Sequence, residues 1–220
     1  MDLFPFAVDS PLHFAPKCNM MMIMQTRTLR TTRGRKETSH ERIVEAAARA
    51  IRRSGYDGAG VADIMKDAGL THGGFYAHFS SREAMLAEAA DRASATGIAE
   101  LARIAAAAPP EQALRELLKA YLSRAHVENV ENGCSLAALC SETPRQAPEV
   151  RHIVTRQIRE MADLVARQSP DWGQPGAHER ALVTVATMVG TLQLARAVDD
   201  ARLSTALCEA ALKHLNPTVP

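Results

Sequence analysis

The sequence predicts an all-α fold, and composition and apolar spacing carry the prediction. Apolar residues make up 46% of the 220 residues, with alanine and leucine dominant, whereas aromatic residues are only 4%. Alanine and leucine favour helices, and the residues that favour strands are sparse and do not alternate. Apolar residues instead recur at three- and four-residue spacing, so we expect about nine helices.

Residues 1–36 are expected to form a disordered basic arm, because prolines come first and Arg33, Arg35 and Lys36 end the segment. The first helix is predicted over 39–54. Thr38 followed by Glu41 fits a capping box at its start, and Gly55 stops it.

Residues 37–82 are predicted to fold as a helix-turn-helix domain. Helices are expected at 61–68 and 72–78, with Gly69 in the tight turn between them. Phe75 and Phe79 lie four residues apart and are assigned to the core. An ordinary helical hairpin is the alternative, but the basic arm and the glycine-rich start of the 72–78 helix favour DNA binding.

Residues 83–217 are predicted to form a second helical domain, for ligand binding and dimerisation. Helices are expected at 81–107, 110–128, 134–142, 149–168, 178–198 and 202–215, with prolines or an Asn-Gly turn in several gaps. Two apolar stripes on the last two helices predict a four-helix dimer interface, although one stripe alone packing internally is the alternative. The stripe residues are Leu182, Val185, Val189, Leu192, Leu203 and Leu207.

Charge and motif content narrow the class of function. The net charge is only +1, but residues 26–80 hold ten basic and six acidic residues, which suits phosphate contacts. No apolar run reaches the roughly 20 residues of a membrane span, and the start lacks a signal-peptide pattern, so we expect a cytoplasmic protein with reduced cysteines. We find no nucleotide loop, nucleophile elbow or metal-ligand spacing, and therefore expect neither an enzyme nor a cofactor.

Residues 55–89, "GYDGAGVADIMKDAGLTHGGFYAHFSSREAMLAEA", resemble the DNA-binding domain of the TetR family of repressors. The resemblance implies a transcriptional regulator that binds a palindromic operator of double-stranded DNA as a homodimer and is released by a small-molecule ligand. In one place the sequence departs from the family: Gly60-Val61 stands where a phosphate-binding threonine or serine is common.

The resemblance also implies which residues meet DNA. Thr71 and His72 would approach base edges, and glycines beside them would let the backbone approach the major groove. Alternatives stay open: His78 as a packed or capping residue, Tyr76 as part of the core, Thr71 as a helix cap. The expected DNA-contacting residues are Arg33, Arg35, Lys36, Thr71, His72, Gly73, Gly74, Tyr76, His78 and Arg82.

Residues 132–151 resemble a segment of several TetR-family ligand domains, without naming a ligand. A ligand would act by shifting the 81–107 helix, which joins the two domains, and so the spacing of the two recognition helices. The candidate ligand residues, each with a place in the core as its alternative, are Tyr121, Cys134, Met161, Leu164, Trp172, Met188 and Gln193.

Two cysteines, Cys134 and Cys140, flank one short predicted helix and raise a thiol-sensing alternative, in which oxidants or electrophiles release the DNA. Two small buried apolar residues are the plainer interpretation. The sequence is also compatible with a non-sensing architectural DNA-binding protein and with a transcriptional activator.

Overall fold

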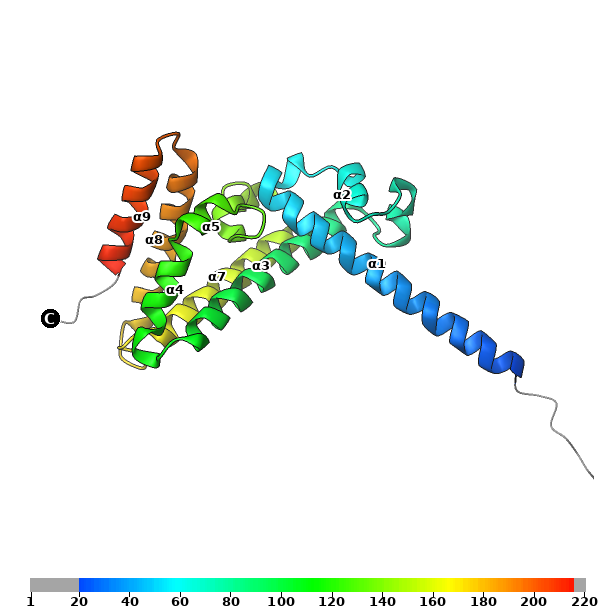
Figure 1. The fold of residues 1–220 in the computed structure, drawn as a ribbon, viewed down its shortest axis with the longest axis horizontal. Helices are drawn as coiled ribbons and strands as arrows, with labels where there is room; N and C mark the ends of the chain where they lie inside the picture. The colour runs from blue at the N-terminus through cyan, green and yellow to red at the C-terminus, as the bar shows by residue number, and fades with distance from the viewer. Residues whose placement is uncertain (1–19, 216–220) are drawn as a thin grey trace, which may run out of the picture. The chain divides into compact units, whose positions relative to one another are not determined.

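The computed structural model describes the backbone of residues 20–215 and the side chains of residues 36–215. Over this range the chain forms nine α-helices and three short 3-10 helices, with no strand, which confirms the all-α prediction (Figure 1). The chain divides into two units, Met1–Thr38 and Ser39–Pro220, and the tertiary contacts given below lie within the second.

Helix α1 spans Met20–Gly58, so it begins well before the predicted start. Residues 20–54 contain no proline and a single glycine, which permits a continuous helix where we expected a disordered arm. Thr38 consequently lies inside α1 and does not cap it. The helix kinks at Gly55, where φ is 76°.

The predicted helix-turn-helix forms from α2 (Val61–Asp67) and the 3-10 helix η1 (His72–Ala77). Gly69 takes a φ of 67° in the turn, and its N–H donates to Lys66 O at 2.9 Å. Ile64 and Met65 of α2 are fully buried. Their burial fixes the face that α2 turns inward.

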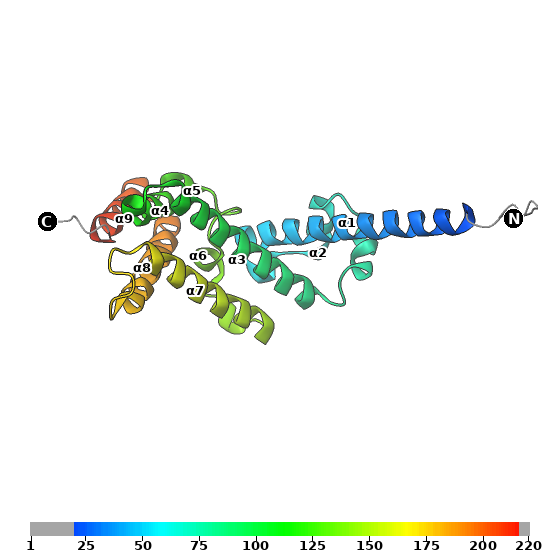
Figure 2. The same ribbon diagram turned by 90° about the horizontal axis from the view of Figure 1, so that it is seen from below.

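The second half of the chain is a helical bundle. Helix α3 spans Arg82–Ala107, α7 spans Pro148–Gln168, α8 spans Ala177–Ala197 and α9 spans Ala201–Leu215. Figures 1 and 2 both show α3 beside α7 and α8 beside α9, and each pair is in contact. Short elements complete the bundle: α6 (Ser135–Leu139) and the 3-10 helix η3 (Thr143–Arg145).

The single helix predicted over 110–128 is divided. It consists of the 3-10 helix η2 (Pro110–Gln112), α4 (Ala113–Tyr121) and α5 (Arg124–Glu128). Ser123 starts α5 as its N-cap, and its hydroxyl accepts a hydrogen bond from the N–H of His126 at 3.2 Å. This capping bond lies at the break between α4 and α5.

Two apolar cores share α3. The first joins α1, α2 and η1 to the first turns of α3, and it also takes in Leu139 and Val150 from beyond the predicted domain boundary. The second begins at Leu101 of α3 and is completed by α4, α6, α7, α8 and α9. Within the described residues, no helix combines the length and apolar character that a membrane crossing requires.

Candidate nucleic-acid interface and ligand cavity

The 3-10 helix η1 turns Phe75 inward, whereas its polar residues and Tyr76 face outward. Thr71, His72 and Gly73 are exposed, and Tyr76 is 77% exposed. Phe75 is buried in the first core. The predicted assignment of Phe75 to the core is therefore confirmed, and Tyr76 is not a core residue.

The start of η1 is open on its outer side. Thr71 has extended backbone angles and makes no side-chain capping bond, so the expected cap does not form. A Cβ built on Gly73 would meet nothing within 4 Å, whereas one on Gly74 would lie 3.7 Å from Met65 Cε. Gly73 thus leaves one side of η1 uncovered.

The other predicted DNA contacts are placed differently. His78 is half-buried, with its ring 6.0 Å from that of His40. Arg82 donates to the carbonyl oxygen of Tyr56 and, at 3.3 Å, to that of Ala59, so its guanidinium holds the turn between α1 and α2. Lys36 is exposed, and the side chains of Arg33 and Arg35 lie outside the described residues.

The predicted dimer residues fall into two groups. Leu182 is 41% and Leu203 is 47% exposed, whereas Val185 and Leu192 are buried in the second core of the same chain. Val189 and Leu207 are partly exposed. Two further apolar residues of α8, Val183 and Leu194, are 63% and 57% exposed and were absent from the predicted set.

A cavity of about 310 Å³ lies in the second half of the chain. Three of the predicted ligand residues, Tyr121, Cys134 and Met161, line it together. The other four are absent from the cavity wall: Met188 is fully buried in the second core, Trp172 is 55% exposed, and Leu164 and Gln193 are half-buried.

Sequence reasoning missed most of the cavity wall. It consists of one side of α3, the ends of α4 and α5, the 129–134 loop and part of α7. A cavity depends on how helices distant in sequence cross, which periodicity does not encode. The missed residues include Gly97, Ile98, Leu101, Ile104, His126 and Gln157.

His126 ties two parts of this wall together. Its Nδ1 lies 2.6 Å from the carbonyl oxygen of Tyr121, and its Nε2 accepts the N–H of Cys134 at 3.0 Å. An acceptor at Nε2 and a donor at Nδ1 require the neutral ring. Burial lowers the pKa of His126 below its ordinary value of 6.5, in agreement with that assignment.

Two buried polar atoms belong to Tyr121, which lines the cavity, and to Arg196, whose guanidinium donates to the carbonyl oxygens of His126 and Val127. The Tyr121 hydroxyl and Arg196 Nη1 have no hydrogen-bond partner among the described residues. Burial raises the pKa of Tyr121 well above 10, with Cys134 adding to the effect. Buried polar groups usually have partners, so this corner beside Cys134 is suited to a polar group of a bound molecule or a water.

Comparisons with known proteins identify the class of protein. Residues 43–89 match the family model for bacterial regulatory proteins of the tetR family. An uncharacterized HTH-type transcriptional regulator of Mycobacterium tuberculosis is 30% identical over 169 residues, which cover 73% of this chain and 85% of the relative. The Bacillus subtilis regulator YvdT is 43% identical over 53 residues, covering 23% of this chain and 27% of YvdT.

Solved structures extend the likeness to most of the chain. A TetR transcriptional regulator from Chloroflexus aurantiacus superposes with a TM-score of 0.68 at 27% identity, covering 82% of this chain and 93% of that one. The reduced form of Escherichia coli NemR gives a TM-score of 0.68 at 19% identity over 80% and 94% of the two chains, which shows a shared fold. From its helix-turn-helix, its helical second half and these matches, the chain belongs to the TetR family of DNA-binding transcriptional regulators.

Proposed function

We propose that this regulator is a repressor, which binds a palindromic operator as a dimer and leaves it when a small molecule occupies the cavity. The observation that carries the proposal is the pairing, in one chain, of an outward polar face on η1 with a separate cavity between α3 and α7. These two features allow DNA and ligand to bind at different sites of one molecule.

The DNA contacts are proposed for the outer side of η1. Tyr76, Thr71 and His72 are exposed there, and Gly73, whose outer side is open, would let the backbone of η1 approach the major groove closely. His78 is proposed as a phosphate contact beside η1, and the exposed Lys36, which belongs to the first unit, is proposed as a separate phosphate contact. Arg82 acts first by holding the turn that precedes α2.

The dimer contact is proposed for the outward faces of α8 and α9. Leu182, Val183, Leu194 and Leu203 are large apolar residues, and all of them are exposed on these two helices. Isolated exposed apolar residues are common, but a group on adjacent helices is typical of an interface. Two residues of the predicted stripe, Val185 and Leu192, lie on the inner side of α8 and pack in the second core.

The ligand is proposed to be small and mainly apolar. The cavity volume of about 310 Å³ lies at the lower end of small-molecule sites, which span roughly 300–1,000 Å³. Ile98, Leu101 and Met161 supply apolar walls, and Gln157 supplies an amide. The amide is itself engaged, since Gln157 exchanges hydrogen bonds with Ser135 at 2.8 and 3.0 Å.

The DNA part of the proposal is tested by fluorescence anisotropy with duplexes from upstream of the gene. Thr71→Ala and Tyr76→Ala are expected to weaken specific binding by about 1–3 kcal/mol each. Trp172→Ala, which removes an exposed aromatic residue outside the DNA-binding half, is the matched control and should bind as the wild type does. Equal affinity of all three variants would contradict the assignment of η1.

A thiol-based signal is the second candidate, because Cys134 lines the cavity beside the Tyr121 hydroxyl and Arg196. The Cys134 thiol would lose its proton to water, and the thiolate would displace iodide from iodoacetamide, so that a carbon–sulfur bond forms as the carbon–iodine bond breaks. Cys140 is half-buried and is not on the cavity wall. If iodoacetamide releases DNA from the Cys134→Ser protein as fully as from a Cys208→Ser control, this candidate fails.

A further inference from the structure

The 129–134 loop takes part in two structures at once. Asn129, Asn132, Gly133 and Cys134 line the cavity. Glu131, in the middle of the loop, instead contacts α1 through both its backbone and its side chain. A six-residue loop therefore joins the cavity to the helix that leads into the DNA-binding elements.

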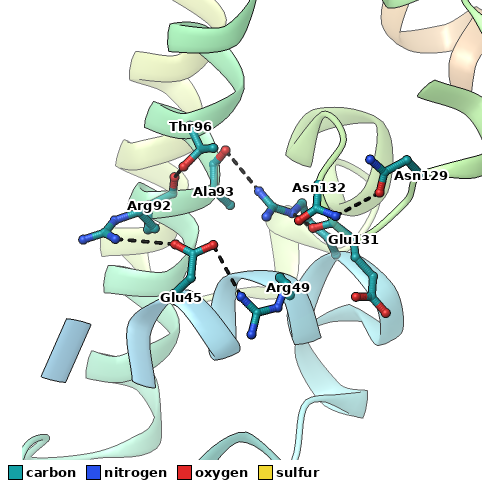
Figure 3. Close-up of polar contacts among 9 residues, drawn as sticks. Glu45, Arg49, Arg92, Ala93, Thr96, Asn129, Glu131 and Asn132 are labelled. Carbon is teal, nitrogen blue, oxygen red and sulfur yellow. Dashed lines mark hydrogen bonds and ion pairs between the residues drawn. The ribbon is translucent and has the colours of Figure 1, made fainter. Parts of the chain in front are cut away.

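The central contact is made by Arg52 of α1, which is only 4% exposed. Its Nε donates to the carbonyl oxygen of Glu131 at 2.5 Å, and its Nη1 donates to the carbonyl oxygen of Ala93 at 3.4 Å. Figure 3 shows Ala93 on α3 and Glu131 on the loop. Burial also lowers the pKa of Arg52, because it disfavours the charged form. A buried charged group requires hydrogen-bond partners, and these two carbonyl groups supply them.

Both acceptors are close in sequence to the cavity wall. Ala93 lies one helical turn before Gly97 of α3, and Glu131 directly precedes Asn132. Arg52 therefore bridges the two walls of the cavity from outside. A displacement of either wall changes the acceptors of a buried charged group.

The next residue extends the connection to α2. Arg53 contacts the Glu131 carboxylate at 3.0 Å and the Asp67 carboxylate at 3.9 Å. These pairs are half-exposed and each contributes little to stability. They nevertheless place loop, α1 and the first helix of the helix-turn-helix in one chain of contacts.

We propose that the 129–134 loop is the relay of the regulator: occupancy of the cavity moves the Glu131 carbonyl, and Arg52 transmits that movement to α1 and the DNA-binding domain. The proposal rests on the proposed ligand response of the cavity. Three residues beyond Arg52, α1 kinks at Gly55, and the N–H of Tyr56 is held by Glu142 at 2.8 Å. Movement of Arg52 thus acts on the segment that enters α2.

A competing route runs through α3 itself, the helix that joins the two domains. Arg92 of α3 pairs with Glu45 of α1 at 3.5 Å, two helical turns from Arg52 along α1, as Figure 3 shows. Both routes join α1 to the cavity half, but only the Arg52 route includes the loop. Removing each arginine in turn separates them.

The test uses a side chain in place of the unidentified ligand. Gly97→Phe fills the cavity from α3, where a Cβ would meet nothing within 4 Å. Amide hydrogen exchange of residues 59–79 is measured for the wild type and Gly97→Phe, each also with Arg52→Met or Arg92→Met. This readout requires no DNA, so a failure of the repressor proposal and a failure of the relay are distinguishable.

We expect Gly97→Phe to change exchange in α2 by about fivefold or more. In the Arg52→Met background, Gly97→Phe should change the exchange rates by less than about twofold. In the Arg92→Met background, the full change should remain. Loss of the effect with Arg92→Met alone, persistence in both backgrounds, or no effect of Gly97→Phe would each overturn the relay. Should Arg52→Met fail to fold, Arg52→Lys is the second variant, because its single ammonium group replaces the separate Nε and Nη1 donors that hold the two carbonyl groups. It is expected to reduce the effect, and no reduction would overturn the proposal.

Discussion

Gly55 is the residue at which α1 kinks, and two features favour glycine there. Its φ of 76° lies in the left-handed region, and a Cβ would stand 2.5 Å from Glu142 Oε1. We expect Gly55→Ala to lower the free energy of unfolding by about 1–3 kcal/mol, measured by urea denaturation.

Gly97→Ala is the matched control for Gly55→Ala. Gly97 lies within α3 in open space, so the substitution should stabilise the protein by about 0.5–1 kcal/mol. If the two substitutions change the free energy of unfolding equally, a side chain at Gly55 causes no strain in the kink.

His126 gives the protein a specific pH dependence. Because burial lowers its pKa in the folded state below 6.5, the unfolded chain binds the proton more readily. Its contribution to stability is therefore present above about pH 6.5 and is lost as pH falls toward the folded-state pKa. Protonation also removes the acceptor for the Cys134 N–H.

The His126→Gln variant, which carries an amide that does not titrate, is expected to lose less stability than the wild type between pH 7.5 and pH 5.5. Urea unfolding at several pH values measures the difference. His72→Gln, at an exposed position, serves as the control. Coinciding pH profiles of His126→Gln and the wild type would show that the ring is not held neutral.

Individual site residues were only partly predictable. Exposure of Tyr76 and burial of Phe75 follow from helical spacing around η1, and the sequence anticipated Phe75. The sequence did not predict that Arg82 would bond within the protein. Its acceptors are the backbone carbonyl groups of Ala59 and Tyr56, which lie 23 and 26 residues before it in the chain. Side-chain identity alone does not distinguish a phosphate contact from such a bond.

At the scale of elements, the long amphipathic helices were predictable and the short ones were not. Helices α3, α7, α8 and α9 begin and end within about two residues of the prediction, since their apolar periodicity extends over several turns. The break between α4 and α5 carries a capping bond to one hydroxyl, that of Ser123, which apolar periodicity does not reveal. The early start of α1 was missed because the prolines of the first residues and the basic residues up to Lys36 suggested disorder over 1–36.

Helix α3 offers a direct test of capping. Ser81 is its N-cap, and the hydroxyl accepts the N–H of Ala84 at 3.1 Å. Ser81→Ala should lower the free energy of unfolding by about 1 kcal/mol, measured by thermal or urea denaturation. Ser80→Ala, at the exposed neighbouring serine, should have little effect, and equal losses in the two variants would remove the capping role.

At the scale of the whole molecule, the predicted division into two helical domains stays a prediction, and the structure adds two apolar cores that share α3. The sequence places the boundary at residues 82–83, yet the first core takes Met85 and Leu86 from α3 together with Leu139 and Val150. These long-range contacts have no signature in local spacing. The cavity was missed in large part for the same reason.

The proposed dimer is tested at this scale. A Leu182→Glu, Leu203→Glu protein places two charges on the outward faces of α8 and α9, where both leucines are exposed. We expect it to sediment as a monomer at concentrations where the wild type is a dimer. Trp172→Glu changes an exposed aromatic residue outside these helices, and monomer formation by this control as well would contradict the assignment of the interface.

The most direct test of the proposed repressor function is selection of bound duplexes from a random pool by the purified full-length protein. We expect recovery of one palindromic sequence, whose half-sites are separated by a helical turn or a multiple of it. We also expect Tyr76→Ala to lose that preference. Salt-sensitive binding with no preferred sequence would contradict the repressor function and favour an architectural DNA-binding protein.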